Sequence, residues 1–152
     1  NNGTGEWKWL QKNKQANFIE KLERGDANGI AKILKNMFRN DATYGYVSPS
    51  LDDAKGKEEK IASNILCDID TTIEFAGLKE LARLTTKPVM GNPYGIKENK
   101  GYILPDAPRH YYYSKKINSL LNLTKKKQAT IWEIGGGYGG LSYYIKTYMN
   151  EN

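Results

Sequence analysis

The chain has only one cysteine and one histidine among its 152 residues, Cys67 and His110. A single cysteine excludes an internal disulfide framework and thiolate zinc clusters, and it favours a reducing compartment, so we expect a cytoplasmic protein. A single histidine excludes a metal site rich in imidazole, and we expect no metal. No apolar run exceeds three residues, which predicts the absence of a membrane span and of a signal peptide.

Charge of one sign is not concentrated in the chain either. Lysine and arginine number 23 against 17 aspartates and glutamates, which gives a net charge of +6. Lysines and glutamates alternate between residues 55 and 60, a pattern typical of a solvated helix face. We therefore do not expect a nucleic-acid partner, although the net charge keeps a nucleic-acid methyltransferase open as an alternative. Hydrophobic residues make up 39% of the chain, enough for one modest core.

Apolar residues recur at helical spacing through most of the first 125 residues. Asp26 is a suitable N-cap, Asp106 with Pro108 marks another helix start, and Thr71 with Glu74 matches a capping box. The expected helices cover residues 7–22 with a break near residue 13, 26–38, 61–69, 71–84 and 106–121. Residues 40–56 and 85–101 are expected to be loops, residues 102–104 a short edge strand, and Cys67 a buried thiol.

The pattern changes after residue 125. Residues 129–134 are β-prone, residues 135–140 contain five glycines, and apolar spacing from residue 141 predicts a helix. A strand, a glycine turn and a helix in this order begin an α/β unit. The fold class is therefore mainly α in residues 1–125, a helical N-terminal or cap region. In residues 126–152 we expect the start of a Rossmann-like α/β methyltransferase domain.

The glycine turn fits two cofactor patterns. Gly135, Gly137 and Gly140 match the G-x-G-x-x-G fingerprint of dinucleotide-binding proteins. Glu133, followed by glycines at 135, 137 and 139, matches the acidic-x-G-x-G-x-G motif of class I S-adenosylmethionine-dependent methyltransferases. A carboxylate repels a pyrophosphate and attracts the methionine ammonium, which favours S-adenosylmethionine as the cofactor. The expected cofactor-binding residues are Glu133, Gly135, Gly136, Gly137, Tyr138 and Gly139. A glycine turn needed only for tight packing is the remaining alternative.

Residues 130–141, Thr-Ile-Trp-Glu-Ile-Gly-Gly-Gly-Tyr-Gly-Gly-Leu, resemble the cofactor motif of bacterial sugar O-methyltransferases associated with surface-polysaccharide biosynthesis. The upstream stretches 92–95 (Asn-Pro-Tyr-Gly) and 109–112 (Arg-His-Tyr-Tyr) are similar to the approach to this motif in that family. The resemblance implies methyl transfer to a sugar hydroxyl of a small molecule or glycan. It also implies that the chain is an N-terminal portion of the enzyme, which we expect to be inactive alone.

Methylation of a hydroxyl requires removal of its proton, and His110 is the only side chain here with an ordinary pKa near neutrality. We consider His110 a candidate base, with a hydrogen-bonded residue at a helix start as the alternative. Tyrosine offers both a stacking face and a hydroxyl to a sugar ring. Tyr94, Tyr111 and Tyr112, together with Arg109, are therefore candidate acceptor-binding residues. The alternative is that tyrosine is simply abundant, since the chain has 11.

Another class of function remains open beside the enzymatic ones. The helical region fits a noncatalytic binding or assembly module whose glycine turn binds no cofactor. Homo-oligomerisation through this region also stays open, because helical periodicity alone does not distinguish a core face from an interface.

Overall fold

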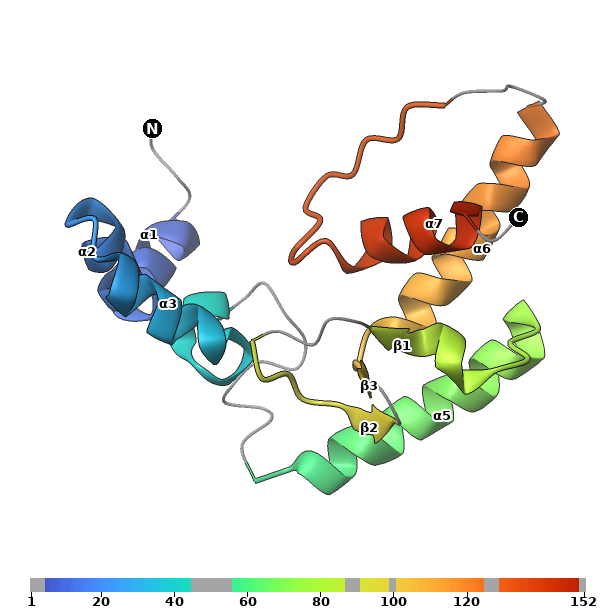
Figure 1. Ribbon diagram of the computed structural model, residues 1–152, viewed down its shortest axis with the longest axis horizontal. Coiled ribbons are helices and arrows are strands. Elements are labelled where there is room, and N and C mark those ends of the chain that lie inside the picture. Colours follow the sequence, from blue (N-terminus) through green and yellow to red (C-terminus); the bar gives the residue numbers. More distant parts are fainter. Residues whose placement is uncertain (1–4, 45–55, 87–90, 99–100, 125–128, 151–152) are drawn as a thin grey trace.

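The computed structural model describes residues 5–44, 56–86, 91–98, 101–124 and 129–150 of the chain. It is mainly helical, as expected, with a small antiparallel sheet of three strands (Figure 1). The α-helices are α1 (Gly5–Asn13), α2 (Ala16–Glu23), α3 (Ala27–Lys35), α5 (Glu58–Ala76), α6 (Ala107–Thr124) and α7 (Gly140–Asn150). Short 3₁₀ helices are η1 (Met37–Arg39), η2 (Asp41–Thr43) and η3 (Leu81–Leu84). None of the described helices is long and apolar enough to cross a membrane.

The N-terminal helices follow the capping signals closely. The break between α1 and α2 lies at residues 14–15, which confirms the interruption expected near residue 13. Asp26 is the N-cap of α3, as predicted, because its Oδ1 accepts a hydrogen bond from the Gly29 amide at 2.8 Å. The helix ends at Lys35, earlier than expected. The Asn40 side chain accounts for this end, since its Nδ2 donates to the carbonyl oxygens of Ile33 and Asn36 at 2.9 and 2.8 Å.

Helix α5 is continuous where the sequence suggested two helices. The predicted capping box at Thr71 is wrong, because Thr71 Oγ1 donates within the helix to the Cys67 carbonyl oxygen at 3.1 Å. Gly77 ends α5 instead, with φ of +60° in the left-handed region that favours glycine. The thiol of Cys67 is exposed rather than buried, because the face of α5 that packs on the core carries Ile65 and Ile69.

The sheet corrects the loop expected between residues 85 and 101. Strands β1 (Thr85–Thr86) and β2 (Ile96–Glu98) both pair antiparallel with β3 (Gly101–Ile103). The predicted strand near residue 102 is therefore present, but it is the central strand and not an edge. A side chain at Gly95, where φ is +153°, would overlap the Ile103 carbonyl oxygen, so the chain needs glycine as it enters β2. Residues 87–90 and 99–100 lie outside the described residues.

The core lies where α5, α6, α7 and the sheet meet. Its most deeply buried side chains include Ile65 of α5, Leu84 of η3 and Ile103 of β3. Helix α6 begins next to Asp106 and has Pro108 in its first turn, as the sequence predicted. Helix α7 packs on α6 (Figure 1), and its buried Tyr144 hydroxyl donates to the Leu84 carbonyl oxygen at 2.5 Å. The glycine turn before α7 is thereby attached to the core.

The strand expected over residues 129–134 is not formed. These residues run outside the three-stranded sheet, as the extended segment that leads into α7 in Figure 1. Trp132 is 88% exposed and Ile134 fully exposed. A β-strand needs a neighbour for its backbone hydrogen bonds, and in the described part of the chain this segment has none. A helix after the glycines is confirmed, whereas a Rossmann-like unit is not.

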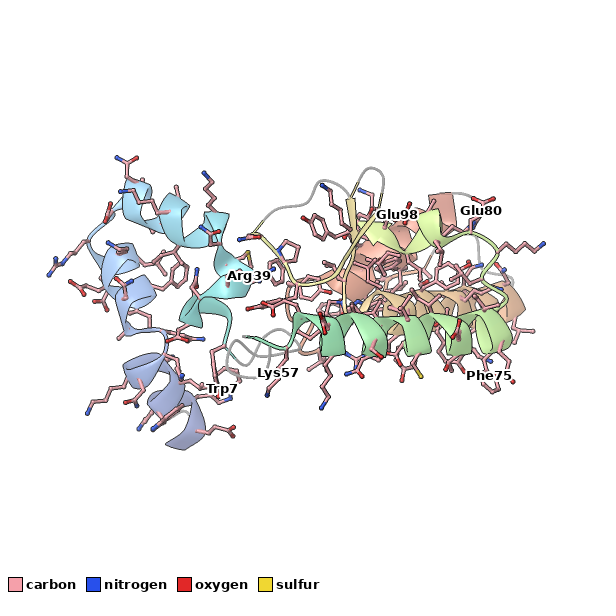
Figure 2. The ribbon with its side chains drawn as sticks, turned by 90° about the horizontal axis from the view of Figure 1, so that it is seen from below. Trp7, Arg39, Lys57, Phe75, Glu80 and Glu98 are labelled. Carbon is pink, nitrogen blue, oxygen red and sulfur yellow. The ribbon has the colours of Figure 1, made fainter. Side chains whose placement is uncertain are left out.

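Arg39 connects the N-terminal helices to the segment that precedes β2. Its guanidinium lies 3.6 Å from the ring centroid of Tyr94, and it donates to the Asn92 and Pro93 carbonyl oxygens at 3.0 and 3.3 Å. A further contact of 3.8 Å joins it to the Glu58 carboxylate at the start of α5. Figure 2 shows Arg39 at the place where the N-terminal helices meet the rest of the molecule. One side chain therefore holds three separate segments together.

Candidate functional site

The glycine turn has a backbone that residues with side chains rarely adopt. Gly135, Gly137 and Gly139 have φ angles of +71°, +53° and +82°. A Cβ added at Gly135 or Gly139 would have no neighbouring atom within 4 Å, so these two positions need glycine for their backbone and not for space. The turn is closed by the Gly139 amide, which donates to the Gly136 carbonyl oxygen at 2.8 Å. It thus leaves bare backbone directly before the first turn of α7.

The Glu133 carboxylate lies against this turn. Its Oε2 accepts a hydrogen bond from Ser142 Oγ at 2.5 Å and would be 3.0 Å from a Cβ added at Gly136. Ser142 is in the first turn of α7, so the negative charge lies near the positive end of the helix dipole. The structure therefore brings together the acidic residue and the glycines of the predicted cofactor motif, and the side chain is accessible to solvent.

His110 reaches the other side of the turn from α6. An added Cβ at Gly140 would lie 2.6 Å from His110 Nδ1, and the imidazole packs edge-on against the Tyr138 ring, with centroids 6.0 Å apart. Nδ1 is buried and has no hydrogen-bond partner among the described residues. Burial lowers the pKa of His110 below its ordinary value of 6.5, more than the nearby Asp106 raises it. The imidazole is therefore neutral at pH 7 and retains an acceptor nitrogen.

Aromatic rings surround His110. Tyr138 packs edge-on against Phe38 of η1 with a centroid distance of 5.5 Å, and Tyr144 lies 6.1 Å from the imidazole. Burial raises the pKa of both tyrosines above their ordinary value of 10, so both phenols stay protonated at neutral pH. The N-terminal helices thus contribute Phe38 to the surroundings of the turn, while Tyr138 and Tyr144 contribute neutral rings.

The candidate acceptor-binding residues are dispersed. Tyr94 is buried beneath Arg39, and Tyr111 is buried in the hydrophobic core. Tyr112 is half-buried, with Lys116 Nζ 5.5 Å from its ring centroid. Arg109 is exposed and forms an ion pair of 2.6 Å with Asp106. The structure therefore places His110 and Tyr138 at the glycine turn, whereas these four side chains engage other neighbours.

Four residues at the site were not among the predicted site residues. Phe38 was predicted only as part of an apolar helix face, and Tyr144 only as part of the face of the last helix. Ser142 carries a usable signal, because a serine in the first helical turn commonly forms a local polar contact. Gly140 was assigned to the dinucleotide pattern, and its close approach to His110 has no signature in the sequence.

The described side chains contain no group of three or more histidines, cysteines, aspartates and glutamates that could hold a metal ion. Comparison of the chain with protein families, curated proteins and solved structures finds no match. The resemblance to sugar O-methyltransferases therefore depends on the residues of the glycine turn and the stretches upstream of it.

Proposed function

We propose that the chain binds S-adenosylmethionine at the glycine turn and serves an O-methyltransferase that acts on a sugar hydroxyl. One observation carries this proposal. Gly135 and Gly139 have positive φ and open space around them, and the Glu133 carboxylate lies against the same turn. Since no neighbouring atom requires these glycines to be small, their role is the conformation of the backbone, which a ligand can approach closely. This argues against a glycine turn that serves only tight packing.

The charge at the turn fits this cofactor. S-adenosylmethionine supplies a methyl group on a positively charged sulfur and also carries an ammonium group. The Glu133 carboxylate would attract that ammonium, and the exposed backbone of residues 135–139 would line the rest of the ligand. Ser142 keeps the carboxylate in place through its hydroxyl. A pyrophosphate would meet the same carboxylate as a repulsive charge.

His110 is suited to receive the proton of the acceptor hydroxyl. The acceptor hydroxyl would take the methyl group as the bond from that carbon to the sulfonium sulfur breaks and leaves its electron pair on sulfur, and the hydroxyl proton would have to pass to a base. His110 is neutral at pH 7, and its buried Nδ1 lies next to the turn with no hydrogen-bond partner in the described part of the chain, so this nitrogen would have to become accessible when the acceptor binds. Tyr138 and Tyr144 remain protonated and thus cannot serve as bases at that pH.

The proposal includes a Rossmann-like sheet that begins at residues 129–134. Ile131, Trp132 and Ile134 are all exposed, although β-prone apolar residues of this kind favour a buried strand. We infer that the segment becomes a strand when another strand pairs with it. Hydrogen exchange of the 131–134 amides would then be slow in the presence of a strand that pairs with the segment and fast in the 152-residue chain alone. Equal exchange in both would contradict this inference.

Calorimetric titration with S-adenosylmethionine tests the proposed cofactor. Gly139→Ala introduces a side chain at φ +82° without a clash, so it should disturb the turn alone and weaken binding at least tenfold. Gly25→Ala is a matched control, because Gly25 has φ of +65° and equally open surroundings but lies between α2 and α3. Glu133→Gln should also weaken binding. Undiminished affinity in Gly139→Ala and Glu133→Gln would refute the proposed site.

A dinucleotide is the second candidate ligand, supported by one observation. In the G-x-G-x-x-G pattern the last glycine permits close packing of the helix, and Gly140 is closely packed against His110. Titration of the same protein with NADH distinguishes the two ligands. Binding of NADH that improves in Glu133→Gln, through removal of a repulsive charge, would favour the dinucleotide.

A further inference from the structure

A groove of about 680 Å³ lies in the N-terminal helices, apart from the glycine turn. Its walls come from α2, α3 and residues 36–42, together with Lys14 between α1 and α2. This volume lies within the range of sites that hold small molecules. Nothing in the proposed methyl transfer uses this groove, so a ligand bound there would serve a separate function.

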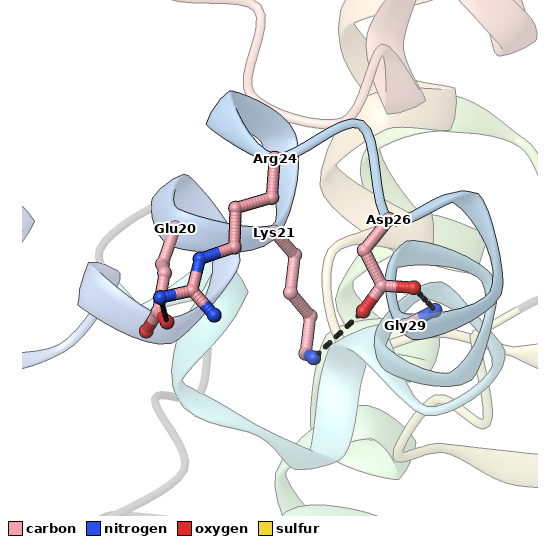
Figure 3. A network of polar contacts seen from close by, with 5 residues as sticks. All are labelled: Glu20, Lys21, Arg24, Asp26 and Gly29. Carbon is pink, nitrogen blue, oxygen red and sulfur yellow. Dashed lines mark hydrogen bonds and ion pairs between the residues drawn. The ribbon is translucent and has the colours of Figure 1, made fainter.

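The groove carries three lysines and two aspartates. Lys21 Nζ lies 3.0 Å from Asp26 Oδ2, as Figure 3 shows, and Lys14 Nζ lies 4.0 Å from Asp41 Oδ1. Asp26 is held further by the Gly29 amide, which, together with Lys21, lowers the pKa of its carboxyl below the ordinary 3.8. Both aspartates are thus matched by a lysine. Lys32 supplies the excess positive charge: it forms no ion pair within the described ranges, although its charge also helps to lower the pKa of Asp26.

Four asparagines also line the groove, and they divide into two pairs. Asn36 and Asn40 maintain the fold, since Asn40 Nδ2 binds two backbone carbonyl oxygens and Asn36 Oδ1 accepts from Asn92 Nδ2 at 3.0 Å. Asn17 on α2 and Asn28 on α3 are exposed. Each of these two amides offers two donor hydrogens and an acceptor oxygen, which is the combination that hydroxyl groups need. Phe18, half-buried, adds an apolar surface.

We propose that this groove binds a small hydroxylated anion, that is, a molecule with several hydroxyl groups and one phosphate or carboxylate. Lys32 receives the anionic group, and Asn17 and Asn28 bind the hydroxyls. The two aspartates disfavour a polyanion such as a nucleic-acid backbone, because each would face additional phosphates at short range. A ligand with a single anionic group matches the net positive charge that Lys32 gives to the groove.

The proposal can be tested by titrating the 152-residue chain with four probes. These are glucose 6-phosphate, glucuronate, glucose and inorganic phosphate. NMR signals of the backbone amides and the asparagine side-chain amides report the binding. We expect glucose 6-phosphate, glucuronate or both to shift the Asn17 and Asn28 side-chain signals and to bind about tenfold more tightly than glucose or inorganic phosphate. A preference between the first two identifies phosphate or carboxylate as the anionic group.

Two variants on α3 provide the matched comparison. Lys32→Gln should weaken binding of the preferred probe about tenfold, whereas Lys35→Gln, which removes the same charge from a residue outside the groove, should not. Absence of binding by all four probes, or equal weakening by both variants, would overturn the proposal. Inorganic phosphate that binds as tightly as glucose 6-phosphate would also overturn it. Gly139→Ala keeps this binding whether or not the cofactor site exists, so the two proposals fail separately.

Discussion

Replacement of Arg39 by alanine is the sharpest test of how the N-terminal helices are held to the rest of the protein. The guanidinium stacks on Tyr94 at 3.6 Å, which contributes about 1 kcal/mol for a partly desolvated cation–π contact. Its hydrogen bonds to the Asn92 and Pro93 carbonyl oxygens contribute about 1 kcal/mol each, after allowance for partial exposure. The 3.8 Å contact with Glu58 adds little, since Glu58 is exposed. The expected loss is about 3 kcal/mol.

Urea unfolding followed by circular dichroism measures this loss. For a chain of this size, about 3 kcal/mol lowers the midpoint by roughly 1–2 M urea. Native-state hydrogen exchange gives a local readout, because the Phe38 amide donates to the Gly91 carbonyl oxygen next to Arg39 and should lose protection. Arg39→Lys keeps the positive charge but not the planar group, so it should restore no more than about half of the stability.

Arg24→Ala is the control for Arg39→Ala. Arg24 forms an exposed ion pair with Glu20 one turn away on α2, visible in Figure 3, and its loss should cost less than about 0.5 kcal/mol. A cost below about 0.5 kcal/mol for Arg39→Ala as well would refute the reasoning. It would mean that the N-terminal helices are held by other contacts, or that they separate readily from the rest of the protein.

Three measurements test how α7 and His110 pack together. The single histidine gives one set of ring NMR signals, and we expect the pKa of His110 to lie below 6.5. The stability of the fold should therefore fall as the pH is lowered from about 7 through that pKa, because the unfolded chain takes up the proton first. His110→Gln should remove this dependence of stability on pH. A measured pKa of 6.5 or higher would contradict the burial argument. Gly140→Ala should cost about 1–2 kcal/mol in thermal unfolding, because its Cβ would lie 2.5 Å from His110 Cε1 and 2.9 Å from Tyr138 Cε2. The cost should be smaller in a His110→Ala background, where only the tyrosine contact remains, and equal costs would exclude the histidine clash as the cause. Tyr144→Phe should lower the free energy of unfolding by about 1–2 kcal/mol, because it removes the hydrogen bond to the Leu84 carbonyl oxygen. Tyr143→Phe is the control and should lower it by less than about 0.5 kcal/mol, so equal effects would argue against that hydrogen bond.

The features that the sequence predicts best are local ones. The Asp26 cap and the Asp106 and Pro108 helix start depend on neighbours within four residues, and the structure contains both. The capping box at Thr71 failed although its letters are right, because Thr71 bonds to Cys67 within a helix that packs on the core along its whole length. A capping motif predicts a boundary only where tertiary packing does not favour a longer helix.

Contacts between residues far apart in the chain could not be predicted from the sequence. The glycine turn and the nearby Glu133 carboxylate, by contrast, were predictable, because all of these residues lie within one short segment. The contact of Phe38 with Tyr138 joins residues a hundred positions apart, and no periodicity indicates it. The aromatic residues were read as ligand contacts, yet Tyr94 and Tyr111 are buried, since a tyrosine that suits a sugar ring also suits a protein core.

The segment before the glycine turn has a consequence for handling the protein. Ile131, Trp132 and Ile134 present an apolar, β-prone stretch to solvent, and such a stretch is a template for pairing with the same stretch of another molecule. We expect the isolated chain to self-associate as its concentration rises, and its tryptophan fluorescence to shift to shorter wavelength as Trp132 becomes covered. A charged residue at position 134 should then suppress this self-association and keep preparations monodisperse, without disturbing the helical core.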